Sequence, residues 1–375
     1  MALLYGVMRG FYAGIVKRGL FLFEPEAVHV RAVSIGESLG KSRIARRVIG
    51  GFLKWDYPEL TTSLFGITFK SPIGLAAGFD YEARLPTLLP FLGFGFGTVG
   101  TLTHRPYGGN PPPMLGRLPQ SRSLMVNKGF KNRGVSATLA PWNAAKFSCP
   151  VGVSIGKTND ADIATQAEAV ADVVSGFQDA ERSGVAFSYY ELNISCPNLA
   201  GSVEFYDPAH LDELLSAIRG LGLSRPVFVK MPISKTNREI EGLLDIIMQY
   251  PFIAAVIFGN LQRDRKNPAF VSEEVERFPT GNFSGAPCQE RSDELIRLAY
   301  EKYGTRLKII GCGGIFSAED AYRKIRAGAS LVQLITGLIF EGPQLVAEIN
   351  SGLVQLFKRD GYRHITEAIG SSEAR

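Results

Sequence analysis

From residue 70 onward, short apolar runs alternate with longer amphipathic stretches. Eight of the runs are rich in β-branched residues or glycine and have the length of buried strands. They lie at 73–80, 96–103, 151–158, 189–195, 226–231, 254–260, 307–314 and 331–337. Most of the stretches between them, such as 162–184 and 317–328, place apolar residues at helical spacing. The pattern therefore predicts strands that alternate with helices.

Eight such units predict an α/β fold, a closed parallel (β/α)8 barrel of the TIM type. A doubly wound open sheet is the alternative, but the regularity of eight units favours closure. Each run ends in small or polar residues, and the carboxyl ends of barrel strands form the face that carries active sites. The connection 104–150 exceeds an ordinary loop and contains three successive prolines, so we expect a hairpin or lid over that face.

The chain divides into a predicted helical extension (1–60), the barrel (61–360) and a C-terminal tail (361–375), whose stretch ITEAIGSSEAR (365–375) we expect to be frayed. Apolar residues of the extension recur at spacings of three and four, namely Leu3, Leu4, Val7, Met8, Phe11, Tyr12, Ile15 and Val16. Basic residues interrupt them, so no run reaches the ~18 residues of a spanning helix. Such a helix either lies on an anionic membrane surface or packs on its own domain, and periodicity alone does not decide.

The charge distribution supports a separate role for the extension. The net charge is +5, yet residues 1–54 carry nine Lys or Arg against three acidic residues, so the rest of the chain is nearly neutral. A nucleic-acid enzyme would spread basic surface around its site, so this class is disfavoured, and we expect no nucleic-acid partner.

The four cysteines are widely spaced and form no CxxC or Cys/His cluster, which argues against a disulfide framework or a bound metal.

Two glycine-containing segments predict a phosphate site. GCGG (311–314) and TG (336–337) end the seventh and eighth strands, where barrels of this type commonly bind phosphate through backbone N–H groups. Ser317 is a plausible N-cap for the helix that follows. Neither GxxxxGK[ST] nor a GxGxxG between strand and helix occurs, so a phosphate-bearing cofactor in the barrel mouth fits better than a P-loop or Rossmann site.

The chain resembles the FMN-dependent dihydroorotate dehydrogenases over nearly its whole length. The stretches that carry the resemblance are LFEPEAVH (22–29), GLAAGFD (74–80), GFGFGTVGTLTHRPYGGNPPPMLGRL (93–118), GFKNRG (129–134), SIGK (154–157), NISCPN (193–198), VKMP (229–232), GNFSG (281–285), IIGCGGI (309–315) and AGASLVQLITGLIFEGP (327–343). The first of them is similar to the extension of the membrane-associated branch, which passes electrons to quinone.

The resemblance implies an FMN cofactor in the barrel mouth, with its phosphate on Gly313, Gly314, Thr336 and Gly337. The other implied flavin-binding residues are Ala77, Gly78, Thr101, Ser154, Asn193, Lys230 and Gly285. A cation such as Lys230 beside the pyrimidine part of a flavin would stabilise the reduced, anionic form. His29 and Arg105 are the implied candidates for a quinone site.

The implied substrate amides are Asn193, Asn198, Asn260 and, less securely, Asn127, because the stretch around it is one residue short. Each amide offers a donor and an acceptor, which suits the alternating N–H and C=O groups of an orotate-like ring. Cys196 stands at the family's catalytic-base position, and the neighbouring Ser195 is the alternative base. A buried, inert thiol is the other interpretation of Cys196.

Several positions depart from the family pattern. Cysteine at the base position belongs to the soluble branch, whereas the extension belongs to the membrane-associated one. Tyr81 replaces a lysine that contacts flavin and substrate, Leu261 replaces a threonine, and Ile335 replaces a tyrosine. Ser154 and Thr158 replace two asparagines. Flavin binding thus looks intact, while the substrate pocket is altered.

The resemblance therefore implies an oxidoreductase that converts dihydroorotate to orotate in pyrimidine biosynthesis and passes the electrons through FMN to quinone. One alternative is a related flavin enzyme that acts on another small cyclic substrate. A second is a flavin-binding membrane protein that has lost turnover. We expect a peripheral protein on the cytoplasmic side of a membrane, with a soluble cytoplasmic protein as the alternative.

Overall fold

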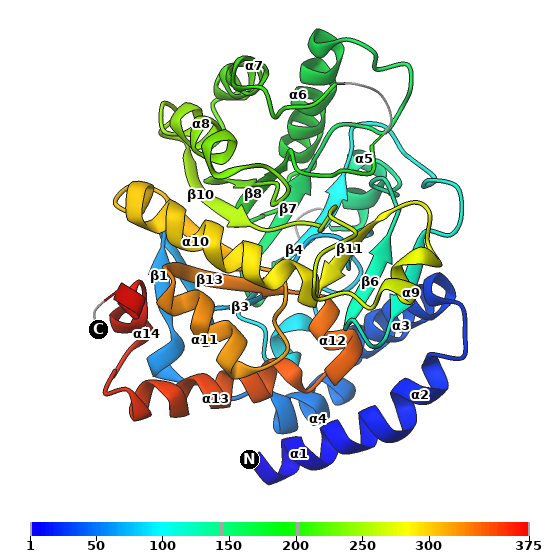
Figure 1. Ribbon diagram of the computed structural model, residues 1–375, viewed down its shortest axis with the longest axis vertical. Coiled ribbons are helices and arrows are strands. Elements are labelled where there is room, and N and C mark those ends of the chain that lie inside the picture. The colour runs from blue at the N-terminus through cyan, green and yellow to red at the C-terminus, as the bar shows by residue number, and fades with distance from the viewer. Residues whose placement is uncertain (1, 143–145, 200–202, 374–375) are drawn as a thin grey trace.

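The computed structural model describes residues 2–142, 146–199 and 203–373 and contains a closed barrel of eight parallel strands (Figure 1). The strands follow the order of the eight predicted runs, and the last pairs with the first. They are β3 (Ile73–Leu75), β4 (Phe96–Leu102), β7 (Val151–Ile155), β8 (Tyr189–Asn193), β9 (Val227–Lys230), β10 (Ile253–Phe258), β12 (Lys308–Cys312) and β13 (Ala329–Leu334). The predicted (β/α)8 barrel is confirmed.

Aromatic side chains fill the amino-terminal half of the barrel interior. The rings of Tyr189 and Phe228 stack with centroids 4.5 Å apart, and Phe96 meets Tyr189 edge-on. A small hairpin, β1 (Thr62–Leu64) with β2 (Ile67–Phe69), places Phe69 against Phe96. Because this end of the barrel is packed with aromatic rings, polar chemistry is left to the carboxyl-terminal end.

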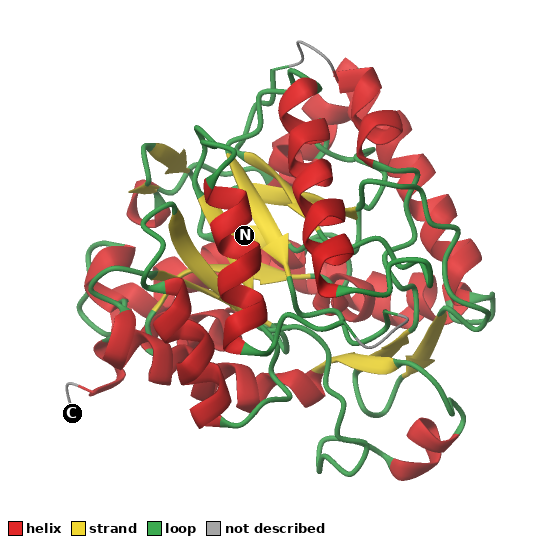
Figure 2. Cartoon of the chain, turned by 90° about the horizontal axis from the view of Figure 1, so that it is seen from above, coloured by secondary structure: helices red, strands yellow, loops and turns green. Residues whose placement is uncertain are grey.

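Helices surround the strands, as the view from above shows (Figure 2). The longer ones are α6 (Gln166–Arg182), α7 (Pro208–Arg219), α8 (Asn237–Ile247), α10 (Gln289–Tyr303), α11 (Ala318–Arg326) and α13 (Leu345–Arg359), and the shorter ones are α5 (Val135–Leu139), α9 (Ser272–Glu276), α12 (Thr336–Glu341) and α14 (Ile365–Ala368). Local signals fix their starts. Thr165 and Glu168 form a capping box at α6, and the predicted N-cap Ser317 accepts from the Asp320 N–H at 3.2 Å.

The long connection after β4 contains the predicted hairpin, formed by β5 (Leu115–Leu118) and β6 (Ser123–Val126). A third strand, β11 (Asn282–Gly285), pairs antiparallel with β6 and was not predicted. The pairing brings a segment that follows β10 next to a segment that follows β4. Residues from two distant connections therefore meet beside the barrel mouth.

The extension consists of α1 (Ala2–Phe11), the π-helical η1 (Tyr12–Val16), α2 (Lys17–Leu20), α3 (Pro25–Lys41) and α4 (Arg43–Leu53). One side of the first helical segment packs on the protein: Tyr5 is buried beside Leu53, and the Tyr12 hydroxyl donates to the Ile339 carbonyl at 2.9 Å. The predicted apolar face is thus divided, since Leu3, Val7, Phe11 and Ile15 stay 59–83% exposed. Within the described residues, no helix is long and apolar enough to cross a membrane.

The C-terminal segment is not frayed over its described part, so that expectation was wrong. Ile365 and Ala368 of α14 are fully buried, and the His364 imidazole lies 2.8 Å from the Thr61 carbonyl oxygen. Apolar burial and this contact hold the segment on the barrel. Residues 374 and 375 lie outside the described part of the chain.

Candidate active site

A cavity opens at the carboxyl ends of the barrel strands and gathers most of the predicted site residues. The predicted residues that line it are Ala77, Gly78, Thr101, Asn193, Cys196, Asn198, Lys230, Asn260, Gly285, Gly313, Gly314, Thr336 and Gly337, together with His29 from the extension. Ser154, Ser195, Asn127 and Arg105 do not line it. Most of the residues predicted at the carboxyl ends of the strands therefore share one cavity, and polar partners described below hold the four exceptions elsewhere.

Glycines form one wall of the cavity, where the sequence predicted phosphate. Gly285, Gly313 and Gly314 have φ values of 88°, 103° and 68°, a region that side chains other than hydrogen rarely allow. A Cβ on Gly314 would lie 2.3 Å from the Gln289 Cβ, and one on Gly337 would lie 2.2 Å from the Ile315 carbonyl oxygen. Only bare backbone fits here, and bare backbone is what lets N–H groups approach an anion closely. The wall therefore fits the phosphate of a bound cofactor.

Lys230 ends β9 and is 4% exposed. Its buried acidic neighbour is Glu191 on β8, which sequence reasoning missed although an acid within the run YYELN was a visible signal. Burial raises the pKa of Glu191, and the Lys230 charge opposes that shift. Ser154 donates to Glu191 at 2.8 Å and contacts the Thr101 hydroxyl at 2.9 Å. Ser154 thus supports the cavity floor from below instead of facing the cavity.

Two of the predicted amides, Asn193 and Asn260, are joined in one hydrogen-bonded chain. Asn193 donates to Thr101 Oγ1 at 2.8 Å, Ser195 Oγ donates to Asn193 Oδ1 at 3.0 Å, and Asn260 donates to Ser195 Oγ at 2.7 Å. Fixed amides of this kind present defined donors and acceptors to a planar polar ring. The hydroxyl of Ser195 is occupied by the two amides that it connects.

Asn198 is held from the opposite side of the cavity. It donates to the Val126 carbonyl at 3.0 Å and accepts from Asn282 of β11 at 2.6 Å, a partner that only the unpredicted strand could reveal. Asn127 turns away, because its side-chain oxygen accepts from Asn110 at 3.0 Å. Of the four predicted amides, three therefore reach the cavity.

Cys196 lines the cavity, whereas Ser195 lies beneath it with 2% exposure. Burial raises the pKa of the Cys196 thiol to about 12, against the lowering effect of the Asn198 backbone N–H and the Lys230 charge. Ser195 is bonded to two amides, so of these two residues it is Cys196 whose side chain faces the cavity.

A family model for dihydroorotate dehydrogenase matches residues 59–357. The chain belongs to the dihydroorotate dehydrogenase family. It is 34% identical over 369 residues to a dihydroorotate dehydrogenase (quinone) of Mycobacterium sp. (strain KMS), covering 97% of this chain and 99% of that one. It is 36% identical over 361 residues to that of Sulfurovum sp. (strain NBC37-1), covering 95% and 97%. Dihydroorotate dehydrogenases are oxidoreductases that depend on a flavin.

The fold comparison agrees with the family. The structure of the Eimeria tenella dihydroorotate dehydrogenase in complex with ferulenol superposes with a TM-score of 0.81 at 27% identity, covering 96% of this chain and 99% of that chain. The match includes the extension, since the covered share exceeds the barrel alone. This family member therefore shares the whole architecture with a solved relative.

Three departures from the dihydroorotate dehydrogenase pattern do line the cavity. Tyr81, Leu261 and Ile335 all contribute to its wall, and Ile335 lies 3.8 Å from the position of a Cβ on Gly78. Thr158 instead donates to Asp172 at 2.8 Å and does not reach the cavity. The altered residues thus concentrate where a substrate or flavin would be contacted.

His29 connects the extension to the cavity. Its ring stacks on Tyr81 with centroids 5.5 Å apart and meets Phe79 edge-on at 5.0 Å. Its Nε2 atom is buried and has no hydrogen-bond partner within the described residues. Arg105 lies elsewhere, since it pairs with Asp160 at 3.0 Å and is 43% exposed, so the structure does not bring the second quinone-site candidate to the cavity.

The His29 imidazole, whose Nε2 atom is buried, makes folding sensitive to acid. Burial lowers its pKa from 6.5 to about 3, and the Lys128 charge adds to the effect. Between these values only the unfolded chain binds the proton, so His29 contributes stability that is complete above about pH 6.5 and falls as the pH drops. The free energy of unfolding, measured with urea, should therefore rise with pH over the mildly acidic range. We expect His29→Gln to reduce the slope of this rise by about 1 kcal/mol per pH unit. Parallel curves for the two proteins would contradict this burial effect.

Proposed function

We propose that this protein oxidises dihydroorotate to orotate with a bound FMN and delivers the electrons to quinone. The observation that carries the proposal is the convergence of Cys196, Lys230 and the three amides on one cavity next to the glycine wall. The relatives that align over nearly the full chain are named dihydroorotate dehydrogenase (quinone), which supports the choice of both substrate and acceptor.

The residues present fit FMN. Gly313, Gly314 and Gly337 would hold the phosphate through bare backbone N–H groups, together with Thr336, which lines the same cavity. Ala77, Gly78 and Thr101 would border the ring system, and Lys230 would supply positive charge beside it. When bound, the flavin supplies the acceptor for the hydride that leaves the substrate.

The remaining chemistry belongs to the side chains of this chain. Asn193, Asn198 and Asn260 orient a cyclic imide by donating to its carbonyl groups and accepting from its N–H groups. Cys196, as the thiolate, accepts the proton that leaves one ring carbon and becomes the neutral thiol, while the hydride leaves the neighbouring carbon. The cavity holds the substrate and Cys196 side by side, so the proton acceptor is already in place and does not have to diffuse in from solvent.

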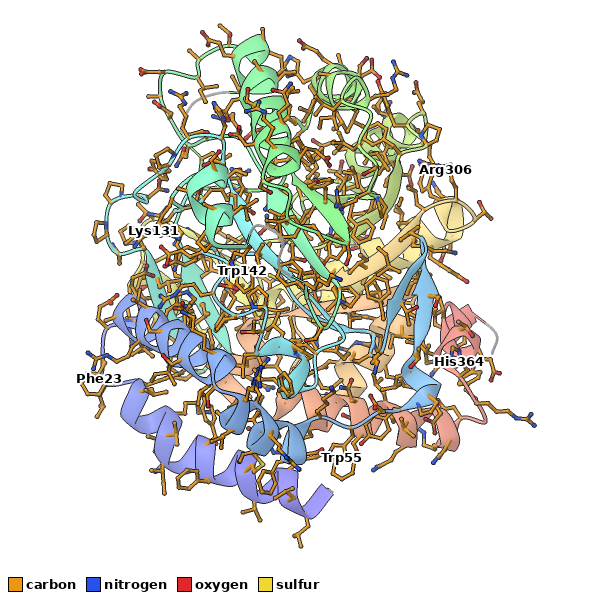
Figure 3. The ribbon with its side chains drawn as sticks, turned by 180° about the vertical axis from the view of Figure 1, so that it is seen from behind. Phe23, Trp55, Lys131, Trp142, Arg306 and His364 are labelled. Atoms are coloured by element: carbon orange, nitrogen blue, oxygen red, sulfur yellow. The ribbon has the colours of Figure 1, made fainter. Side chains whose placement is uncertain are left out.

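We assign the extension to the membrane and the quinone. Its exposed stripe, defined as Leu3, Val7, Phe11 and Ile15, faces away from the protein, and Figure 3 shows Phe23 at the outer edge of the same part of the molecule. Apolar stripes flanked by basic residues bind the interface of anionic bilayers. His29 and the apolar residues Leu115, Leu124 and Ile339 would then guide a quinone toward the flavin.

Turnover with different acceptors tests the proposed function. We expect orotate to form when dihydroorotate and a short-chain ubiquinone analogue are both present, and to form far more slowly with NAD+ or fumarate. Orotate production that requires NAD+ would contradict the quinone assignment while leaving dihydroorotate oxidation in place.

The exposed stripe gives a separate prediction. We expect Phe11→Asp to lower partition onto anionic vesicles by about 10- to 100-fold, because it removes the burial of one large apolar side chain and adds a negative charge. Vesicle co-sedimentation measures the change, and Phe11→Leu is the matched control that keeps an apolar residue. Turnover in detergent with a water-soluble quinone should not change. Equal sedimentation of both variants would show that the exposed stripe does not contact the membrane.

The altered cavity residues favour one second candidate. Tyr81, Leu261 and Ile335 change three positions of the wall, so a related cyclic substrate that loses a proton and a hydride from adjacent carbons is the alternative. Such a substrate would use the same base and the same flavin. Reduction of the flavin by dihydroorotate itself separates the two candidates.

A further inference from the structure

Two lysines and one glutamate join the extension to the cavity wall. Glu26 of α3 pairs with Lys128 at 2.8 Å through one carboxylate oxygen and with Lys131 at 3.1 Å through the other. Figure 3 shows Lys131 beside the extension. One carboxylate between two ammonium groups leaves this lysine cluster, defined as Lys128, Glu26 and Lys131, with an excess positive charge.

The excess charge lies at the cavity. Within the described residues, the cationic side chains that line the cavity are Lys128, Lys131 and Lys230, and no acidic side chain lines it. Lys230 already has the buried Glu191 as a neighbour. The lysine cluster therefore provides the positive charge that is left for an anionic ligand.

Lys128 is the buried member of the cluster and lines the same cavity as the three predicted amides. It is 8% exposed, and its ammonium nitrogen is 4.4 Å from the centre of the Tyr81 ring. Two residues before it, Val126 accepts the hydrogen bond of Asn198. The same short segment thus fixes a substrate amide through its backbone and carries a cation through its side chain.

The groups around the Lys128 ammonium do not cancel its positive charge. Tyr81 and the His29 ring are uncharged partners, and the Tyr81 hydroxyl lies 3.4 Å from Glu26. Glu24, Glu82 and Arg84 are the other charged groups near the cluster. Glu82 lies 3.9 Å from the Arg84 guanidinium, which offsets its charge, and Glu24 is exposed to solvent that screens it. Burial lowers the pKa of Lys128, and Glu26 raises it again by pairing with the charged form.

We propose that Lys128 is a specificity-determining residue that selects a substrate with a carboxylate on its ring. The inference rests on the proposed function, since dihydroorotate and orotate carry such a group whereas dihydrouracil and uracil do not. A buried positive charge acts more strongly across a cavity wall than through water, so direct contact with the ligand is not required. The neutral ring would gain nothing from the cluster.

Ligand binding to the flavin-loaded protein tests the inference without turnover. Titration of orotate and of uracil, followed by the change in the flavin absorption spectrum, gives both dissociation constants. We expect Lys128→Met to weaken orotate binding by about 10- to 100-fold and uracil binding by less than about twofold, because only orotate loses a charged partner. Lys128→Arg, which keeps the charge, should restore most of the preference.

Glu26→Gln distinguishes charge from mere support of the fold. It removes the competing carboxylate and increases the positive charge, so at mildly acidic pH, which keeps the Lys128 amine protonated, orotate should bind as tightly as in the wild type or more tightly. If the cluster only fastens α3 to the barrel, Lys128→Met and Glu26→Gln would weaken orotate binding to the same extent. Both would also weaken uracil binding in parallel, and this result would overturn the inference. Wild-type protein that neither binds orotate nor is reduced by dihydroorotate would instead fail the proposed function and the inference with it.

Discussion

Replacing Cys196 with alanine is expected to slow flavin reduction by dihydroorotate by about 10²- to 10⁴-fold, the usual contribution of a positioned base. Cys196 lines the same cavity as the three amides, and its removal leaves no group at that place to accept the proton. Flavin content should stay unchanged, because the glycine wall lies on other strands. Anaerobic stopped-flow absorbance measures the rate.

The pH dependence of the flavin-reduction rate distinguishes a thiol base from other groups. With the pKa of Cys196 raised to about 12, little thiolate exists at neutral pH, so the wild-type rate should rise by about tenfold per pH unit through the neutral and alkaline range. In Cys196→Ala that slope should disappear. Ser195→Ala is the control and should cost less than about tenfold, since its hydroxyl only connects Asn193 and Asn260. A full rate in Cys196→Ala, or an equal loss in Ser195→Ala, would assign the base elsewhere.

The largest loss of stability is expected from Asp293→Ala. The Lys324 ammonium is fully buried and lies 2.6 Å from Asp293 and 2.8 Å from the Ser292 hydroxyl. Removal of the carboxylate leaves an uncompensated buried charge, which typically costs about 3–5 kcal/mol. Urea unfolding of the flavin-loaded protein measures the change.

This pair also supports the candidate flavin site. The Lys324 side chain packs under β12, where its Cδ lies 3.0 Å from the position of a Cβ on Gly311, just before Gly313 and Gly314. We therefore expect Asp293→Ala to lose flavin more readily, and added FMN to restore part of the stability. The double variant Asp293→Ala with Lys324→Met removes both charges and should recover most of the loss. An unchanged urea midpoint in Asp293→Ala would show that the pair contributes nothing.

The barrel could be predicted because its signal is local and repeated. Each strand run ends at the same face, so the sequence order of the runs also placed Asn193, Lys230 and Gly313 around one cavity. The extension shows where local signals end. Periodicity identified an apolar face on the first helix, but only tertiary packing determines that Tyr5 and Tyr12 turn inward while Val7 and Phe11 turn outward.

Apart from Glu191, which the sequence shows within a strand run, the misses at the site share a physical cause, since each depends on a partner in another segment of the chain. Asn127 accepts from Asn110 and so leaves the cavity, while Arg105 is drawn to Asp160. Asn282 reaches Asn198 only because β11 pairs with β6, and Lys128 reaches the cavity only with Glu26 of the extension as its partner. Residue types and spacing along the chain do not specify such pairs.

An anaerobic stopped-flow mix of the flavin-loaded protein with dihydroorotate tests the central claim most directly. Bleaching of the oxidised flavin band, with one orotate formed for each flavin reduced, is the result that the proposed function predicts. Flavin that stays oxidised under saturating dihydroorotate but bleaches with another cyclic substrate would contradict it. That outcome would assign the altered wall of Tyr81, Leu261 and Ile335 to a different substrate of the same chemistry.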